Sequence, residues 1–198
     1  MEGITQEGTG IWRVFARSWL TGDPELRLCP SATRPLPGNP LPWGGTFHCF
    51  TMGAVAPKAP EKNYVTGHGS YGINTWTYPL VVGQSEFRSW ASCDVRGASR
   101  IPAIFDCATQ EGAISHLDSP PEYEYALAPE WPYPYRVWSV CMNRHSEAIN
   151  MLFLDWSARR VGLKELWTFK WRPEFNTSGP WTKAGGVLPD DWPEWMRR

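Results

Sequence analysis

Residues 143–157 read Asn-Arg-His-Ser-Glu-Ala-Ile-Asn-Met-Leu-Phe-Leu-Asp-Trp-Ser, and this stretch decides the fold that the sequence predicts. A polar turn at Asn143, Arg144 and His145 precedes a mostly apolar run that ends at Asp155, an order typical of a hairpin entering and leaving a central strand. Nine residues separate His145 from Asp155, which predicts that they lie near opposite ends of one strand. Either side chain can cap backbone donors there or pair with Arg144, and we favour this structural role over catalysis.

Further strand-like segments lie on both sides of this stretch. They are enriched in β-branched and aromatic residues and bounded by turn-forming residues. The strands we expect cover residues 70–76, 101–107, 136–142, 149–156 and, on weaker grounds, 159–163. The last three follow one another closely, which predicts an antiparallel meander.

Two short helices are expected from apolar residues that recur at three- and four-residue steps. The first covers residues 6–19 and the second residues 163–171. Their apolar positions are Ile11, Trp12, Phe15 and Trp19 in the first, and Leu163, Leu166, Trp167 and Trp171 in the second. The fold class expected is α+β, with an antiparallel sheet packed on a short helix.

Long segments rich in proline and glycine interrupt these elements. The chain has 19 Pro and 18 Gly among 198 residues, together with 13 Trp. We interpret residues 30–66 as a Pro-rich insertion, residues 109–135 as a second loop, and residues 172–198 as an extended tail. Because no fixed-period repeat or linker divides the chain, residues 1–198 are interpreted as one domain.

Composition and charge exclude several classes of protein. With 42% hydrophobic and 20% charged residues, the sequence is typical of a folded domain. The net charge of −1 offers no large positive field for phosphates, so we do not expect nucleic acid as a partner. No run of about 18 apolar residues occurs, so no membrane span is expected in the chain.

The cysteine spacing leaves two interpretations open. The five cysteines are Cys29, Cys49, Cys93, Cys107 and Cys141, and no two of them form a C-x-x-C motif. Each is explained equally well as a small buried apolar residue or as a candidate for a disulfide in an oxidising compartment. The sequence does not rank the pairings.

No catalytic or cofactor motif has a convincing context. Residues 67–72 match G-x-G-x-x-G, but β-type residues follow in place of the helix that a dinucleotide site needs. The four histidines lie far apart, so no metal hydrolase is expected. Loop carboxylates are expected to be solvated, with a bound calcium ion as the minor alternative. A hydrolase built on His145 and Asp155 would require both side chains to line one pocket.

The His145-X9-Asp155 spacing resembles the H-X9-DG motif of type II secretion pseudopilin-like proteins of the planctomycete type. Further segments that resemble this family are residues 141–145, 161–168, 179–187 and 192–196. The resemblance implies a pilin-type head exposed outside the inner membrane, with no catalytic residues and no required cofactor. Trp156 replaces the motif's glycine, at a position where a turn would favour a positive φ. The family's prepilin signal and long apolar helix are absent from residues 1–198. Either this sequence is trimmed, or the protein has lost the helix and is expected to assemble through its head alone.

We therefore expect a non-enzymatic structural protein, extracellular or at the cell surface, that assembles with copies of itself or with related pseudopilin subunits. The candidate contact residues are Trp181, Trp192, Trp195, Trp131 and Tyr133, and removal of residues 175–198 is expected to abolish assembly. The alternative is a surface carbohydrate-binding module that stacks sugar rings on exposed Trp and Tyr.

Overall fold

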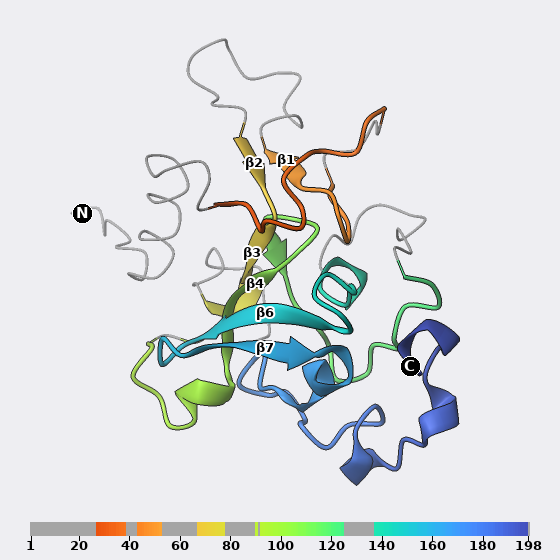
Figure 1. Ribbon diagram of the computed structural model, residues 1–198. Helices are drawn as coiled ribbons and strands as arrows, with labels where there is room; N and C mark the ends of the chain where they lie inside the picture. Colours follow the sequence, from red (N-terminus) through yellow and green to blue (C-terminus); the bar gives the residue numbers. More distant parts are fainter. Residues whose placement is uncertain are drawn as a thin grey trace, which may run out of the picture.

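A computed structural model describes residues 27–38, 43–52, 67–77, 90, 92–124 and 137–197 (Figure 1). The helix expected over residues 6–19 lies outside these residues, as do the candidate contacts Trp131 and Tyr133. Within the described residues, no helix is long and apolar enough to cross a membrane.

A five-stranded sheet forms the centre of the molecule, in the order β5-β3-β4-β6-β7. Its strands are β3 (Tyr71–Asn74), β4 (Pro102–Asp106), β5 (Glu111–Gly112), β6 (Ala148–Phe153) and β7 (Ala158–Gly162). All neighbouring strands are antiparallel except β3 and β5. A second sheet pairs β1 (Phe50–Met52) with β2 (Gly67–Gly69). The mostly antiparallel sheet is consistent with the α+β class predicted.

Four of the five expected strands are present, and the prediction of a strand over residues 136–142 is wrong. Residues 136–142 do not form a strand, because the chain makes a 3₁₀ helix, η4 (Val137–Ser139), in which Val137 accepts from the amides of both Val140 and Cys141. Val137, Val140, Cys141 and Met142 are all buried. A short apolar run buried on every side carries no periodicity that separates a strand from a helical turn.

The glycine motif at 67–72 runs through β2 into β3, as the sequence context indicated. Gly72 is required by close packing, because a Cβ there would lie 2.7 Å from the Cβ of Cys107. The remaining helical segments described are 3₁₀ turns: η2 (Thr75–Thr77), η3 (Ala98–Arg100), η5 (Leu163–Thr168), η6 (Lys183–Gly185), η7 (Pro189–Asp191) and η8 (Glu194–Met196).

One face of the sheet carries the hydrophobic core. Side chains alternate along β6, so Ile149, Met151 and Phe153 are buried on this face while Asn150 points to the other. The helix expected at 163–171 is η5 followed by an irregular turn. Its predicted apolar residues are all buried in the core, namely Leu163, Leu166, Trp167 and Trp171.

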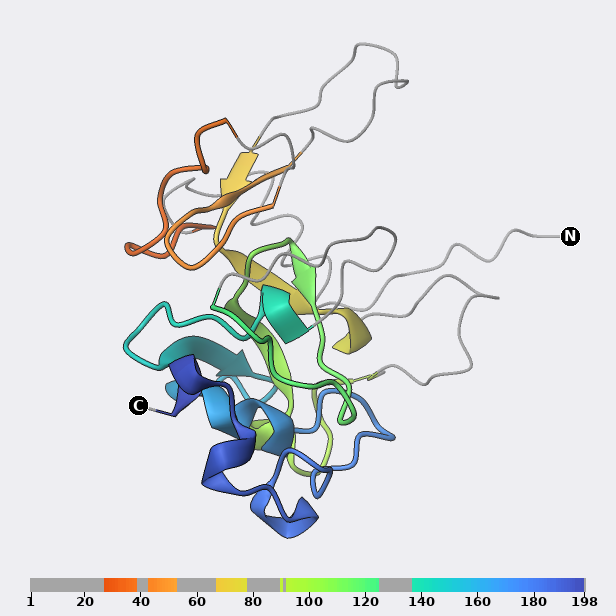
Figure 2. The ribbon, with the colours of Figure 1, turned by 90° about the vertical axis from the view of Figure 1, so that its right-hand side faces the viewer.

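The C-terminal segment covers this core and is not a free extended arm. Trp192 is buried against Trp167 and Trp181, with ring centroids 5.5 and 5.6 Å away. Phe175 and Met196 are buried in the same cluster. Figures 1 and 2 show this segment (blue) at the opposite end of the molecule from β1 and β2. Removing residues 175–198 would therefore expose the subunit's own core, which makes that truncation unsuitable as a test of assembly.

Candidate functional site

The guanidinium of Arg144 is the centre of a buried polar cluster at the end of β4. It donates from Nε to the carbonyl of Thr46 (2.9 Å), from Nη1 to the carbonyl of Ser70 (2.6 Å), and from Nη2 to the carbonyl of Gly45 (2.6 Å). Nη1 also pairs with Oδ1 of Asp106 at 3.0 Å. The side chains of Arg144 and Asp106 are both fully buried. Arg144 thus links three segments that are distant in sequence: residues 45–46, Ser70 and the end of β4 at Asp106.

Asp106, the last residue of β4, has both carboxylate oxygens engaged. Oδ1 accepts from Arg144, and Oδ2 accepts the backbone amide of Asn150 at 2.7 Å. Oδ2 also lies 3.1 Å from Nε2 of His145. A buried carboxylate is tolerated only when a cation and hydrogen bonds replace its lost hydration, and Asp106 has both.

His145 Nε2 is approached by three polar atoms. They are Oδ2 of Asp106 at 3.1 Å, Sγ of Cys29 at 3.2 Å and Nδ2 of Asn150 at 3.1 Å. Within the described residues, these are the side chains that gather as a group suited to a metal ion: Cys29, Asp106 and His145. The loop carboxylates, such as the acidic pairs at 122/124 and 190/191, form no such group in that part of the chain.

A tight turn holds His145 in place. Oδ1 of Asn143 accepts the amide of Glu147 at 2.5 Å, and Ser146 and Glu147 both have positive φ, at 53° and 64°. Arg160 on β7 donates to the carbonyls of His145 and Ser146. The polar turn predicted before β6 is therefore present, and its backbone carbonyls are bound from the neighbouring strand.

Burial keeps the site's thiol and phenol protonated. Desolvation raises the pKa of the Cys29 thiol, and the charge of Asp106 raises it further. Desolvation is also the main cause that raises the pKa of Tyr71, and the neighbouring Cys29 and Asp106 add to it. The sulfur of Cys29 and the carboxylate of Asp106 also approach the same ring nitrogen. A thiol nucleophile needs its general base oriented from the other ring nitrogen, so the geometry does not match that chemistry.

Asp155 lies at the other end of β6, as predicted. Its carboxylate is exposed and accepts from the amide and the hydroxyl of Ser157, at 3.0 and 2.6 Å. These two bonds lower the pKa of Asp155, with the hydroxyl as the larger cause. Asp155 and His145 do not line one pocket, so the geometry that a hydrolase at these residues requires is absent. Neither residue pairs with Arg144, whose carboxylate partner is Asp106.

The other predicted site residues are scattered. Trp192 is buried, whereas Trp181 and Trp195 are half-buried against the chain's own core. The indole of Trp195 donates to the carbonyl of Pro121 at 3.0 Å. All five cysteines are free, and only Cys93 is exposed. The disulfides considered from the sequence are therefore not formed in this structure.

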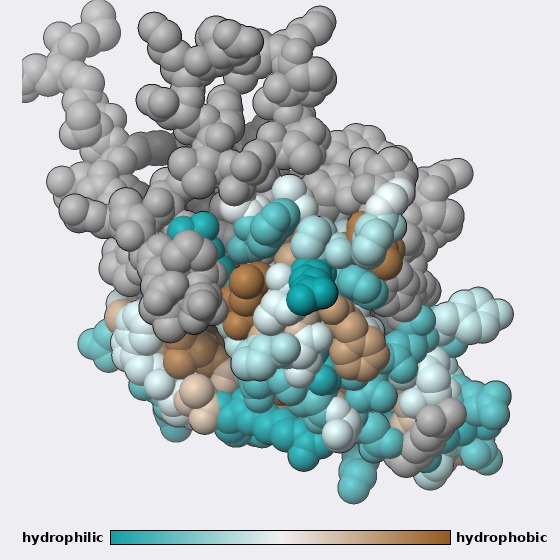
Figure 3. All heavy atoms as spheres, turned by 45° about the horizontal axis from the view of Figure 1, so that its top comes forward, coloured by the Kyte–Doolittle hydropathy of each residue, from teal (hydrophilic) through white to brown (hydrophobic). Residues whose placement is uncertain are grey.

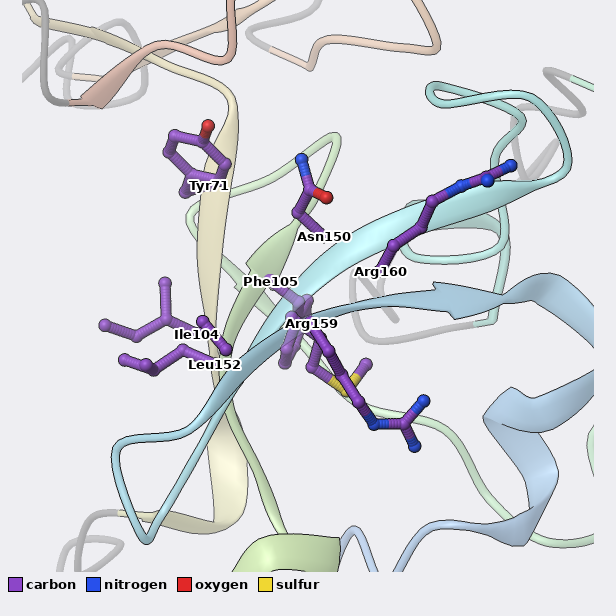
Figure 4. A pocket seen from close by; sticks show the side chains of 9 residues that line it. Tyr71, Ile104, Phe105, Asn150, Leu152, Arg159 and Arg160 are labelled. Carbon is purple, nitrogen blue, oxygen red and sulfur yellow. The ribbon is translucent and has the colours of Figure 1, made fainter.

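The polar cluster borders a shallow hollow on the face of the sheet opposite the core. Tyr71, Ile104, Asn150, Leu152 and Arg160 line it. In Figure 4, Ile104 and Leu152 lie side by side, while Arg159 on the next strand points away from them. Because Asn150 contacts His145 and also lines the hollow, the cluster is adjacent to this open face.

Sequence reasoning found His145, Asn143 and Arg144 but did not connect them with Cys29, Asp106 or Asn150. The sequence offers one signal for Asp106, its position as the last residue but one of the strand expected over residues 101–107, where a buried carboxylate requires a cation.

No protein-family profile matches the chain, and comparisons with curated proteins and with solved structures also find no significant match.

Proposed function

We propose that this chain is a pseudopilin-like structural subunit, a pilin-type head that self-assembles outside the inner membrane. The observation that carries the proposal is the hairpin formed by β6 and β7. Its tip holds Asp155 and Trp156, the second end of the segment that resembles the H-X9-DG motif, and the hairpin presents both an exposed aromatic residue and a strand edge that no described segment pairs with.

The hairpin tip has the conformation that the glycine of the motif would adopt. Phe153 donates to the carbonyl of Ser157 (2.9 Å), and Trp156 donates to the carbonyl of Phe153 (3.0 Å). Trp156 has a φ of 67°, the left-handed conformation typical of the third position in a three-residue hairpin loop. A non-glycine residue there costs roughly 1–2 kcal/mol. Trp156 is nevertheless 60% exposed, which favours a role for its side chain outside the subunit.

The outer edge of β7 is available for pairing. β7 is the last strand of the sheet order, and no other described segment pairs with it. Hydrogen bonds at both ends of the hairpin, from Phe153 to Ser157 and from Leu163 to Glu147, show which residues of β7 bond to β6. Every second residue from Ser157 to Leu163 turns its backbone groups toward β6. The backbone groups of Ala158 and Arg160 therefore face outward. Exposed edges of this kind accept a strand from another chain.

On the face of the molecule that Figure 3 shows, the apolar side chains of the described residues form small separate patches between polar ones. A contact through a strand edge and one aromatic anchor requires less apolar area than a broad docking face. We assign the partner as a second copy of this chain, joined head to tail, because such a contact repeats into a filament when its rotation does not close.

The test replaces Trp156 with glycine. Trp156→Gly removes the aromatic anchor while relieving the positive-φ strain, so the subunit should remain folded. Leu188→Ala is the matched control, because Leu188 is 63% exposed and lies outside the hairpin. Sedimentation velocity over a concentration series should show oligomers for the wild type and Leu188→Ala, and a shift to monomer for Trp156→Gly. A wild type that stays monomeric throughout, or a Trp156→Gly variant that assembles like wild type, would refute the proposal.

The carbohydrate-binding alternative gains no supporting observation. Among the described tryptophans, Trp156 alone is exposed. Three others are buried in the core, namely Trp167, Trp171 and Trp192. The other exposed aromatic residues of the described part, Phe47 and Tyr123, belong to separate segments of the chain, and no row of aromatic faces of the kind such a module would use is formed by the described tryptophans.

A further inference from the structure

We propose that Cys29, Asp106 and His145 form a binding site for a transition-metal ion of the zinc type. Sγ of Cys29, Oδ2 of Asp106 and Nε2 of His145 all lie within 4.8 Å of one another. The proposal is independent of how the subunit assembles, because none of the three residues belongs to the hairpin tip or to the outer edge of β7.

The spacing of the three atoms suits one ion between them. Zinc binds nitrogen and oxygen at about 2.0–2.2 Å and thiolate sulfur at about 2.3 Å, usually in tetrahedral geometry. These lengths separate tetrahedral ligand atoms by roughly 3.3–3.6 Å. The atoms of His145 and Asp106 are 3.1 Å apart, and those of His145 and Cys29 are 3.2 Å apart. The atoms of Cys29 and Asp106 lie within 4.8 Å of each other, so side-chain movement would bring all three atoms to bonding distance of one ion.

Hydrogen bonding alone does not satisfy this arrangement. A ring nitrogen offers either one proton or one lone pair. Three polar atoms nevertheless approach Nε2 of His145, from Cys29, Asp106 and Asn150, all at 3.1–3.2 Å. A metal ion bound through the lone pair of Nε2 would displace the proton of the Cys29 thiol to solvent and engage the resulting thiolate and the carboxylate together. It would also relieve the competition for one proton.

The surroundings resemble the outer shell of a metal site. The carboxylate of Asp106 is fixed by Arg144 on Oδ1 and by the amide of Asn150 on Oδ2. The backbone amide of Cys29 donates to the hydroxyl of Ser70. Bonds of this kind, made to the ligand residues by their neighbours, orient the ligands and reduce the cost of organising them around an ion. Of the three ligands, only His145 is reached by solvent, with 22% of its side chain exposed.

Ligand chemistry favours zinc over calcium or magnesium. One thiolate, one imidazole and one carboxylate form a mixed set that suits zinc and cobalt, whereas hard cations prefer oxygen alone. The fourth position is assigned to water or to the amide oxygen of Asn150. The oxygen and nitrogen of that amide exchange by a simple flip. An ion here would tie the segment that contains Cys29 to the sheet.

Cobalt(II) and zinc(II) titrations of the full-length, reduced protein, prepared metal-free with a chelator, test the proposal. One cobalt should bind with a thiolate-to-cobalt charge-transfer band in the near ultraviolet, and one zinc should displace it. Zinc should also raise the Tm of the wild type. Cys29→Ser should abolish the band, and Cys29→Ser and His145→Gln should each weaken zinc binding by about 100-fold or more.

Cys93→Ser and His68→Gln are the matched controls, because both residues are exposed and lie outside the cluster. They should retain the band, the stoichiometry and the rise in Tm. The proposal fails if the folded wild type shows no thiolate-to-cobalt band at micromolar cobalt, or if Cys29→Ser binds as tightly as wild type. It also fails if calcium binds in preference to zinc. Circular dichroism of each variant separates loss of the ligand from loss of the fold.

Discussion

The two ends of residues 143–157 contrast sharply, although one motif spans both. At the first end, Arg144 is fully buried and bonded to three carbonyls and to Asp106. At the second, Asp155 and Trp156 are exposed, and the carboxylate bonds only within its own turn. The difference teaches that the fixed spacing of His145 and Asp155 along the chain does not give these residues a shared role, because the two ends of the strand face different surroundings. The buried end joins distant segments, whereas the exposed end shapes one turn.

The largest expected effect follows from removing the buried cation. Arg144→Met should lower the free energy of unfolding by about 3–5 kcal/mol, because the charge of Asp106 would be left buried without its partner. Urea unfolding measures the loss. The double variant Arg144→Met/Asp106→Asn should recover part of it, since neither charge then remains. Arg96→Met, at an exposed turn, should stay within about 0.5 kcal/mol of wild type. If Arg144→Met lowers the free energy of unfolding by less than about 1 kcal/mol, the buried end does not stabilise the fold more than the exposed end does, and the contrast is wrong.

A smaller effect should appear at alkaline pH near the buried end. Desolvation is the larger cause that raises the pKa of the Cys141 thiol above its ordinary 9.0, and Glu124 adds to it. The unfolded thiol ionises first, so the stabilising contribution is complete below pH 9 and is lost as the pH rises toward the folded pKa. Denaturant titrations from pH 8 to about 11 give the free energy of unfolding at each pH. This free energy should fall less steeply with pH for Cys141→Ala than for wild type, and the two slopes should differ by up to about 1.4 kcal/mol per pH unit. Cys93→Ala, which alters an exposed thiol, should keep the wild-type slope. Equal slopes for all three proteins would contradict this expectation.

The smallest effect belongs to the exposed end. The hydroxyl of Ser157 is the main cause that lowers the pKa of Asp155 below 3.8. Ser157→Ala should therefore raise this pKa toward 3.8, as measured by NMR titration of the carboxyl carbon. Ser99→Ala, at an exposed position in η3, should leave it unchanged. The small contribution of Asp155 to stability is present above pH 3.8 and is lost as the pH falls through the lowered pKa. An unshifted pKa in Ser157→Ala would show that the turn is not held by this side chain.

Local patterns in the sequence predicted much of the sheet. The apolar runs around β4 and β6 are long enough to identify, and the turn residues beside them set their limits. The site was not predictable in the same way, because its contacts are non-local. Cys29 and His145 are separated by 116 positions, and Arg144 reaches the carbonyl of Gly45 across 99. A carbonyl that accepts a buried guanidinium leaves no trace in residue identity.

The C-terminal segment shows a different limit of sequence reasoning. Its tryptophans indicated that large apolar area had to be buried, but composition does not distinguish burial within a subunit from burial against a neighbour. Trp192 is buried within the subunit, in the cluster that contains Trp167. Composition did not distinguish Trp156 from the buried tryptophans, yet it is the exposed aromatic residue on the hairpin. Its replacement of glycine was the one visible mark of an unusual turn.

The burial of Trp192 and Met196 also has a consequence for the order in which the protein folds during synthesis. The ribosome completes β3, β4, β6 and β7 before either residue is added. The apolar side of the sheet, with Phe105, Met151 and Phe153, must therefore wait for cover that is translated after all of its strands. Nascent chains with exposed apolar surface of this kind are bound by chaperones and are prone to aggregate. Folding on the ribosome should accordingly be delayed until residue 196 has left the exit tunnel.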